Sequence, residues 1–127
     1  MKIEFMATIT RTIVTSNPDK LFLFGDNDQR TGYGGQAAAM RGCTNALGIR
    51  TKQAPSWAPT AFYNDANYSE NCLKIDEDFA KIPANTTCLV IPNAGIGTGR
   101  ARLAELAPRT FAHLQSKFQT LIASGTI

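Results

Sequence analysis

Two segments of the chain contain apolar runs that lead directly into glycine-rich loops. The first is "KLFLF" at residues 20–24, and the second is "TTCLVIP" at residues 86–92. An apolar run bounded by turn-forming residues indicates a strand that is buried on both faces, as in a parallel sheet. We therefore expect two buried strands, each ending in a glycine loop.

Helical patterns follow both loops. The segment "QAAAMRG", from Gly35 or Gln36 onward, is rich in strong helix formers and ends at Gly42. A second helix is predicted from Pro108, because proline lacks only an N–H that the first helical turn does not use. Its apolar residues are spaced three and four apart and form one stripe, which could serve the core or the interface of a homo-oligomer: Phe111, Leu114, Phe118 and Leu121.

The order strand, glycine loop, helix thus occurs at residues 20–42 and again at 86–122. Such repeated units indicate an α/β fold with a largely parallel sheet, in which ligands bind at the carboxyl ends of the strands. We expect both loops to open on the same edge of that sheet.

The remaining segments are expected to be shorter elements. Residues 3–14 are interpreted as one strand or a strand pair, and "NPD" at 17–19 as a turn. A short strand is predicted at 48–52 and a short helix at 75–82, where Ile75, Phe79 and Ile82 are spaced four and three apart. We find no internal repeat and no linker.

Length and charge limit the classes of protein that fit. A chain of 127 residues suits one domain. The net charge is +3, and its lysines and arginines form no continuous basic tract, so a small anionic ligand fits better than a long nucleic acid. The segment "MKIEFMATITRTIV" alternates apolar and polar residues and so lacks a signal-peptide core, and no segment is apolar enough to span a membrane. The three cysteines show no C-x-x-C spacing, which indicates free thiols in a reducing compartment. We therefore expect a cytoplasmic protein.

The loop "NAGIGTGR" at 93–100 has the composition of a phosphate cradle. Its three glycines alternate with other residues, and glycines let successive backbone N–H groups converge on an anion. Arg100 adds a permanent cation with a fork that suits phosphate oxygens. The alternative is a simple glycine turn. The Walker phosphate motif and the G-x-G-x-x-G dinucleotide motif are both absent from the sequence.

The loop "GDNDQRTGYGGQ" at 25–36 combines hydrogen-bond acceptors and donors at the end of a strand. Carboxylates and amides in such a place can hold sugar hydroxyls or position a water molecule. Gly34 and Gly35 would let a ligand approach the start of the next helix. The alternative is a solvated loop in which Asp or Asn caps that helix.

Other candidates have less specific signals. Lys52 follows a predicted strand and could meet a phosphate. Trp57, Phe62 and Tyr63 could stack on a base or pack in the core. His113 is the single histidine and lies off the apolar stripe, and the cysteines are dispersed, so no metal site is expected.

With both loops located, the chain resembles the macrodomain-like superfamily of ADP-ribose-binding proteins. That family has a buried strand ending in Ala-Asn and then Gly-Gly-Gly-Val opening a helix, where this chain has "LFLFGDN" and "GYGGQAAAM". The family's other strand ends in Phe-Pro before a Thr-Gly loop, where this chain has "VIPNAGIGTG". The matching positions are Asn27, Gly34, Gly35, Gln36, Pro92, Ile96, Thr98 and Gly99. A group of small bacterial and phage proteins with the pattern "FGDN…G-x-GGQA…TK…GIGTG" is also similar.

The resemblance implies a single-domain, three-layer fold with a mixed, mostly parallel sheet flanked by helices over residues 1–127. It also implies an ADP-ribose-type nucleotide as ligand, with no cofactor. The family's Gly-Asp-Ile-Thr element, whose Asp reads the adenine, has no counterpart in "TSNPDKLF". Binding of the diphosphate and ribose is therefore better supported than recognition of adenine.

Two functions follow from this resemblance, and a third is independent of it. The first is binding of an ADP-ribosyl group with hydrolysis at its distal ribose, in which Asn27 would orient the sugar and Asp26 or Asp28 would activate water. The second is a non-catalytic sponge or reader for an NAD-derived signal such as cyclic ADP-ribose, for example in phage defence. The third is an RNA-binding module. The expected ligand-binding residues are Gly25, Arg30, Gly34, Gly35, Gln36, Lys52, Asn93, Gly95, Ile96, Gly97, Thr98, Gly99 and Arg100.

Overall fold

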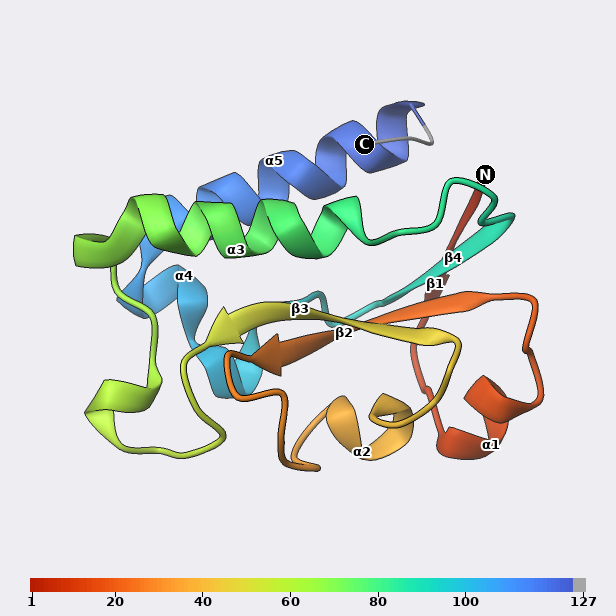
Figure 1. Cartoon of the computed structure of the whole chain (residues 1–127), viewed down its shortest axis with the longest axis horizontal. Coiled ribbons are helices and arrows are strands. Elements are labelled where there is room, and N and C mark those ends of the chain that lie inside the picture. Colours follow the sequence, from red (N-terminus) through yellow and green to blue (C-terminus); the bar gives the residue numbers. More distant parts are fainter. Residues whose placement is uncertain (125–127) are drawn as a thin grey trace.

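The computed structural model describes residues 1–124 as one parallel sheet between two layers of helices (Figure 1). The strands are β1 (Lys2–Met6), β2 (Leu21–Asn27), β3 (Ala46–Lys52) and β4 (Cys88–Pro92). The helices are α1 (Arg11–Thr15), α2 (Ala37–Met40), α3 (Tyr68–Ala80), α4 (Leu103–Leu106) and α5 (Pro108–Ser124), with short 3-10 turns η1 (Pro59–Ala61), η2 (Asp65–Asn67) and η3 (Gly99–Ala101). The predicted α/β class and the two buried strands are confirmed.

The strands lie in the order β1-β4-β2-β3, and each neighbouring pair is parallel. We expected a mixed sheet, but within residues 1–124 the one antiparallel contact outside it is an isolated bridge between Lys52 and Phe62. Because β4 and β2 are neighbours and run in the same direction, their carboxyl ends meet at one edge. Both glycine loops therefore open there, as predicted from the sequence.

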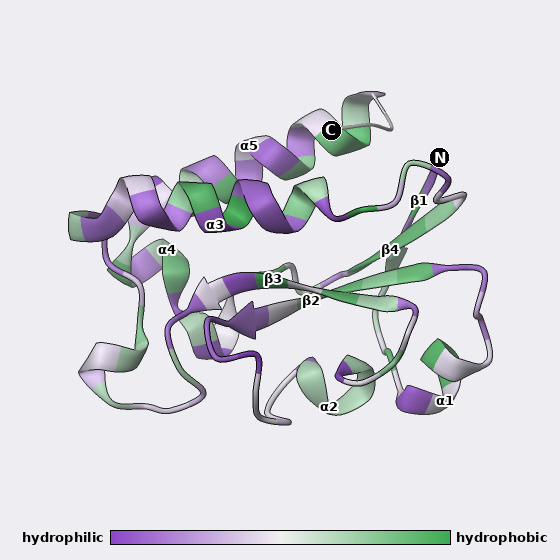
Figure 2. Ribbon diagram, viewed as in Figure 1, coloured by the Kyte–Doolittle hydropathy of each residue, from purple (hydrophilic) through white to green (hydrophobic). Residues whose placement is uncertain are grey.

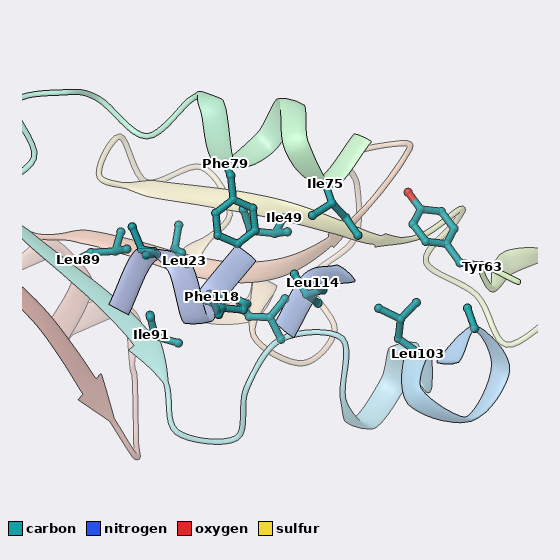
Figure 3. Packing of buried hydrophobic residues seen from close by; sticks show 13 residues of the cluster. Leu23, Ile49, Tyr63, Ile75, Phe79, Leu89, Ile91, Leu103, Leu114 and Phe118 are labelled. Carbon is teal, nitrogen blue, oxygen red and sulfur yellow. The ribbon is translucent and has the colours of Figure 1, made fainter. Parts of the chain in front are cut away.

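Helices α3 and α5 cover one face of the sheet, and α1 and α2 cover the other (Figure 1). The α3–α5 face holds the larger core, in which Phe79 and Phe118 make an edge-to-face contact with ring centroids 5.1 Å apart (Figure 3). Leu114, Phe118 and Leu121 of the predicted α5 stripe are buried in it. The stripe therefore packs within the chain rather than remaining open for a partner.

Three elements differ from expectation. Residues 3–14 are not one strand or a strand pair, because the chain leaves the sheet after Met6 and forms α1, whose first turn is capped by Thr10 Oγ1 accepting the Ile13 N–H. The predicted helix after Gly35 is a single turn, α2, which ends when Arg41 adopts an extended backbone. Helix α3 begins at Tyr68, seven residues before Ile75. The sequence pattern missed its first half because that half is polar and lacks an apolar stripe.

Strand β2 changes from apolar to polar toward its carboxyl end. Figure 2 shows β2 apolar at its start and hydrophilic at its arrowhead. Phe22, Leu23 and Phe24 are fully or almost fully buried, whereas the strand ends in Asp26 and Asn27, which are also buried. Buried polar groups need partners, so the end of β2 must carry a polar network.

Candidate functional site

A cleft of about 400 Å³ lies at the carboxyl edge of the sheet. Its walls come from the end of β2, the glycine loop before α2, the end of β3 and the glycine loop after β4. Asn27 and Gly97, which one ligand must touch if both loops serve it, line this same cleft. Its volume lies within the range of small-molecule sites.

Most of the predicted site residues line the cleft, and four do not. The cleft is lined by the predicted Gly25, Asp26, Asn27, Gly34, Gly35, Gln36, Lys52, Gly95, Gly97, Thr98, Gly99 and Arg100. Ile96 belongs to the core on the α3–α5 face, and Asn93 is exposed with its N–H bonded to Met6 O. The side chains of Asp28 and Arg30 bind residues beneath the cleft instead.

Asp28 and Arg30 are occupied by partners from α3 and its surroundings. The Asp28 carboxylate accepts hydrogen bonds from the Tyr63 hydroxyl at 2.5 Å and from Lys74 Nζ at 2.7 Å. Burial, and then the bond to Asp28, raise the pKa of Tyr63. Arg30 adopts a left-handed backbone with φ of 55° and bridges Asp26 to Asp78. The Asp28–Lys74 and Arg30–Asp78 pairs could not be predicted from the sequence, because their partners lie 46 and 48 positions apart.

Asp26 is held by two arginines at the floor of the cleft. Arg41 donates to Oδ1 at 2.5 Å, and Arg30 donates to Oδ2 at 3.0 Å. The carboxylate lies over Gly48 of the neighbouring strand, where an added Cβ would stand 2.4 Å from Oδ2. The absence of a side chain at Gly48 therefore leaves the space that the Asp26 carboxylate occupies. From there Asp26 holds Arg30 and Arg41 in place.

Gln36 joins the two glycine loops. Its side-chain oxygen accepts the Gly25 N–H at 2.8 Å, and its side-chain nitrogen donates to Gly95 O, also at 2.8 Å. Asn27 similarly holds its own loop, donating to Thr31 O and accepting the Gln29 N–H. Both residues, which we predicted to contact a ligand, fix the walls of the cleft.

The loop after β4 presents free backbone donors. Gly95, Gly97 and Gly99 all have positive φ, at 83°, 83° and 54°. The N–H groups of Gly97, Thr98, Gly99 and Arg100 donate to no acceptor within residues 1–124. Left-handed residues let successive N–H groups converge, and such groups form anion-binding nests.

Lys52 and Arg100 are two cations without an anionic partner in the described part of the chain. Lys52 Nζ donates to Ser56 O at 2.7 Å and lies 5.2 Å from the centroid of the Trp57 ring. Arg100 lies 5.9 Å from the same ring, and its guanidinium occupies the space left by the missing side chain of Gly34. Burial, and then the charge of Arg100, lower the pKa of Lys52.

The sequence did not identify several residues that line the cleft. Arg41 and Tyr33 both do, and although they lie within the quoted segments, nothing in those patterns singled them out. Trp57 was left open between stacking and packing, and the structure places it at the cleft with 62% of its surface exposed. Phe62 and Tyr63, the other two candidates for stacking, are buried.

Among residues 1–124, no three His, Cys, Asp or Glu side chains gather in a way that would hold a metal ion. Over the same residues, no helix has the length and apolar character that crossing a membrane requires.

Comparison with known proteins gives one match. The model of a "Family of unknown function (DUF7831)" matches residues 4–117. No curated protein and no solved structure matches the chain. Because the match covers both glycine loops, the four strands from Glu4 onward and most of α5, the chain belongs to the DUF7831 family.

Proposed function

We propose that this protein is macrodomain-like and binds an ADP-ribose-type nucleotide in the cleft between its two glycine loops. The phosphates would lie against Lys52, Arg100 and the free N–H groups of residues 97–100. The observation that carries the proposal is the pair of unpartnered cations beside these donors.

Electrostatics support an anionic ligand. The cleft is lined by three cationic side chains, Arg41, Lys52 and Arg100, and by one carboxylate, Asp26, which is already paired. Two neighbouring cations repel each other, and the lowered pKa of Lys52 reflects both its burial and this repulsion. A bound phosphate would relieve both effects, because it supplies the missing counter-charge.

The rest of the ligand is supported by geometry and by the resemblance. Asn27 and the loop at 31–36 line the side of the cleft where the macrodomain pattern has the distal ribose. The neighbouring positions of β2 and β4 bring the two resembling loops together on one cleft. A cleft of about 400 Å³ would hold much of a dinucleotide and leave part of it at the mouth.

Binding without turnover fits the contacts better than hydrolysis. Both carboxylates that we considered as the base have cationic partners: Asp26 is paired with Arg30 and Arg41, and Asp28 with Lys74 away from the cleft. The two oxygens of Asp26 already accept hydrogen bonds from two guanidinium groups, so this carboxylate is not free to orient an attacking water. We therefore favour a reader or sponge, and keep the ADP-ribosyl hydrolase as the alternative that the experiment tests.

The test is calorimetric titration with ADP-ribose, followed by mass spectrometry of the recovered ligand. We expect saturable binding at physiological salt, with ADP-ribose returned unchanged after denaturation. The same titration with cyclic ADP-ribose and with an ADP-ribosylated peptide distinguishes a reader from a hydrolase, because only the latter releases product. Absence of heat and of any change in melting temperature with all three ligands would overturn the proposal.

A further inference from the structure

Two large aromatic side chains stand exposed at the mouth of the cleft. Tyr33 is 66% exposed and Trp57 is 62% exposed, and both line the cleft. They belong to different loops, and those loops touch: a Cβ added to Gly32 would lie 2.9 Å from the Pro55 Cβ. The two aromatics therefore lie on adjoining rims of one opening. Trp57 also packs on the buried Phe62, with ring centroids 6.1 Å apart, yet most of its surface remains open to a ligand.

Trp57 lies directly beside the cations that we assign to the phosphates. Lys52 Nζ and Arg100 Cζ lie 5.2 Å and 5.9 Å from its ring centroid. These contacts are within the range of cation–π attraction and hold the indole at the cationic end of the cleft. A flat group attached to a bound diphosphate can reach the indole without crossing the cleft.

Few polar groups near Trp57 remain to read the edge of a base. Lys52 and Arg100 can only donate hydrogen bonds, and Pro55 offers no side-chain group. Ser56 already accepts a hydrogen bond from Lys52 Nζ at its carbonyl and one from the Ala58 N–H at its hydroxyl. The lining side chains that could distinguish bases, Asp26, Asn27 and Gln36, are held in contacts with the chain itself.

Resting on the proposed function, we infer that the cleft recognises the nucleobase by stacking on Trp57 and Tyr33, and accepts nucleoside diphosphates irrespective of their base. Every base has a flat face, so stacking on an aromatic ring is tolerant of base identity. Selection among bases needs hydrogen bonds of fixed direction to their edges, whereas the Tyr33 hydroxyl at this rim can either donate or accept. Lys52 and Arg100 could donate to a base edge, but we assign them to the phosphates. The preferred class of ligand is thus any base joined to a ribose and a diphosphate.

The chain itself provides the probe, because Trp57 is its single tryptophan. We would titrate ADP-ribose, ADP, GDP, CDP and UDP and follow tryptophan fluorescence, with N-acetyltryptophanamide titrated in parallel to correct for absorption by the nucleotides. Ribose 5-phosphate and pyrophosphate serve as ligands without a base. We expect all four diphosphates to quench the fluorescence with dissociation constants within about fivefold of one another.

Variants separate stacking from charge. Trp57→Ala should weaken ADP binding about tenfold in calorimetry, whereas Trp57→Phe should retain most of the affinity. The affinity for pyrophosphate should be unchanged in both. Leu73→Ala, which removes another exposed apolar side chain on α3, is the matched control and should have no effect.

The outcomes distinguish the inference from the function on which it rests. Binding of ADP-ribose with a preference of more than tenfold for adenine, or without quenching, would overturn the inference and leave the function standing. Equal affinity for ADP and pyrophosphate would likewise overturn it. Binding of none of the nucleotides and no pyrophosphate would overturn the proposed function.

Discussion

Two groups of charged residues lie at the carboxyl edge of the same sheet, and they differ in how their charges are matched. In the first, at the floor of the cleft and beneath it, Asp26 and Asp78 are bound by Arg30, Arg41 and Arg50. In the second, at the cleft, Lys52 and Arg100 contact aromatic rings and a carbonyl and have no carboxylate within residues 1–124.

The difference separates charges that serve the fold from charges that remain open for a ligand. Buried charges are tolerated when they are paired and hydrogen-bonded, and Asp78, with no exposed surface, meets both conditions. Lys52 is partly buried and yet unpaired, so its charge is held in a less favourable environment than water offers.

The largest expected effect is on the paired group. Asp78→Asn leaves Arg30 and Arg50 without their shared counter-charge, and we expect the free energy of unfolding to fall by about 3 kcal/mol. This is the lower end of the usual range, because the Arg30 side chain is 33% exposed and water can partly replace the lost contact. Urea unfolding measures the change.

The control for this variant lies on the same helix. Asp76 pairs with His113 and Lys117, and its side chain is 46% exposed. Asp76→Asn should lower the free energy of unfolding by less than about 1 kcal/mol. Equal losses from the two variants would show that burial does not distinguish these carboxylates, and the separation of the two groups would fail.

A second prediction concerns the space that Asp26 occupies. Gly48→Ala places a Cβ 2.4 Å from Asp26 Oδ2 and 2.7 Å from its Cβ, so Asp26 must move away from its arginines. We expect a loss of about 2 kcal/mol in urea unfolding. Gly25→Ala, on the paired strand, meets its nearest atom at 3.6 Å and should change stability by less than about 0.5 kcal/mol.

The third prediction concerns the unpaired group, whose variants should lose ligand affinity but not stability. Lys52→Ala and Arg100→Ala should each weaken binding of ADP-ribose about tenfold, because each removes a charged contact to phosphate. The melting temperature of the free protein should hardly change, since neither side chain completes an ion pair. Lys2→Ala, at the amino end of β1 and thus at the opposite edge of the sheet, is the control. A large loss of stability in the first two variants would place these charges in the structural group.

The same contrast explains how much the sequence could predict. The apolar runs of β2 and β4 and the stripe of α5 are local patterns, and the elements they predict are confirmed. Helix α1 was missed because its "RTIVT" is rich in β-branched residues and is stabilised by the cap at Thr10 and the burial of Val14. Local propensity was overridden there by tertiary packing.

The glycine loops were placed correctly at one edge of the sheet, but their polar partners were not. The Asp26–Arg41 and Arg30–Asp78 pairs join residues 15 and 48 positions apart, a spacing that no periodic pattern marks. Gly34 and Gly35 were read as room for a ligand, whereas Arg100 lies against both of them. Local patterns thus located the site, and pairing at a distance decided which of its charges are free.

The smallest effect, and the sharpest test of the comparison, is the pH dependence that Lys52 contributes. Its pKa in the folded protein is below 10.5, first because of burial and then because of Arg100. Lys52 in the unfolded chain has the ordinary pKa of 10.5. Between its lowered pKa in the folded protein and that value, the unfolded chain binds more protons than the folded one, so the free energy of unfolding rises with pH through that window. Below it the unfavourable contribution of Lys52 is fully present.

Comparison of the native protein with Lys52→Met isolates this contribution, because the variant lacks the titrating group. As the pH rises from neutral toward 10.5, the free energy of unfolding of the native protein should increase relative to that of the variant. Arg100→Gln should make this increase smaller, because it removes one of the two causes of the lowered pKa of Lys52. A bound phosphate stabilises protonated Lys52, so ADP-ribose binding in the same window should take up protons and weaken as the pH rises. Calorimetry in two buffers of different ionisation enthalpy measures the uptake. Release of protons would mean that the phosphate does not meet Lys52, and the charge left unpaired at the cleft would then need another explanation.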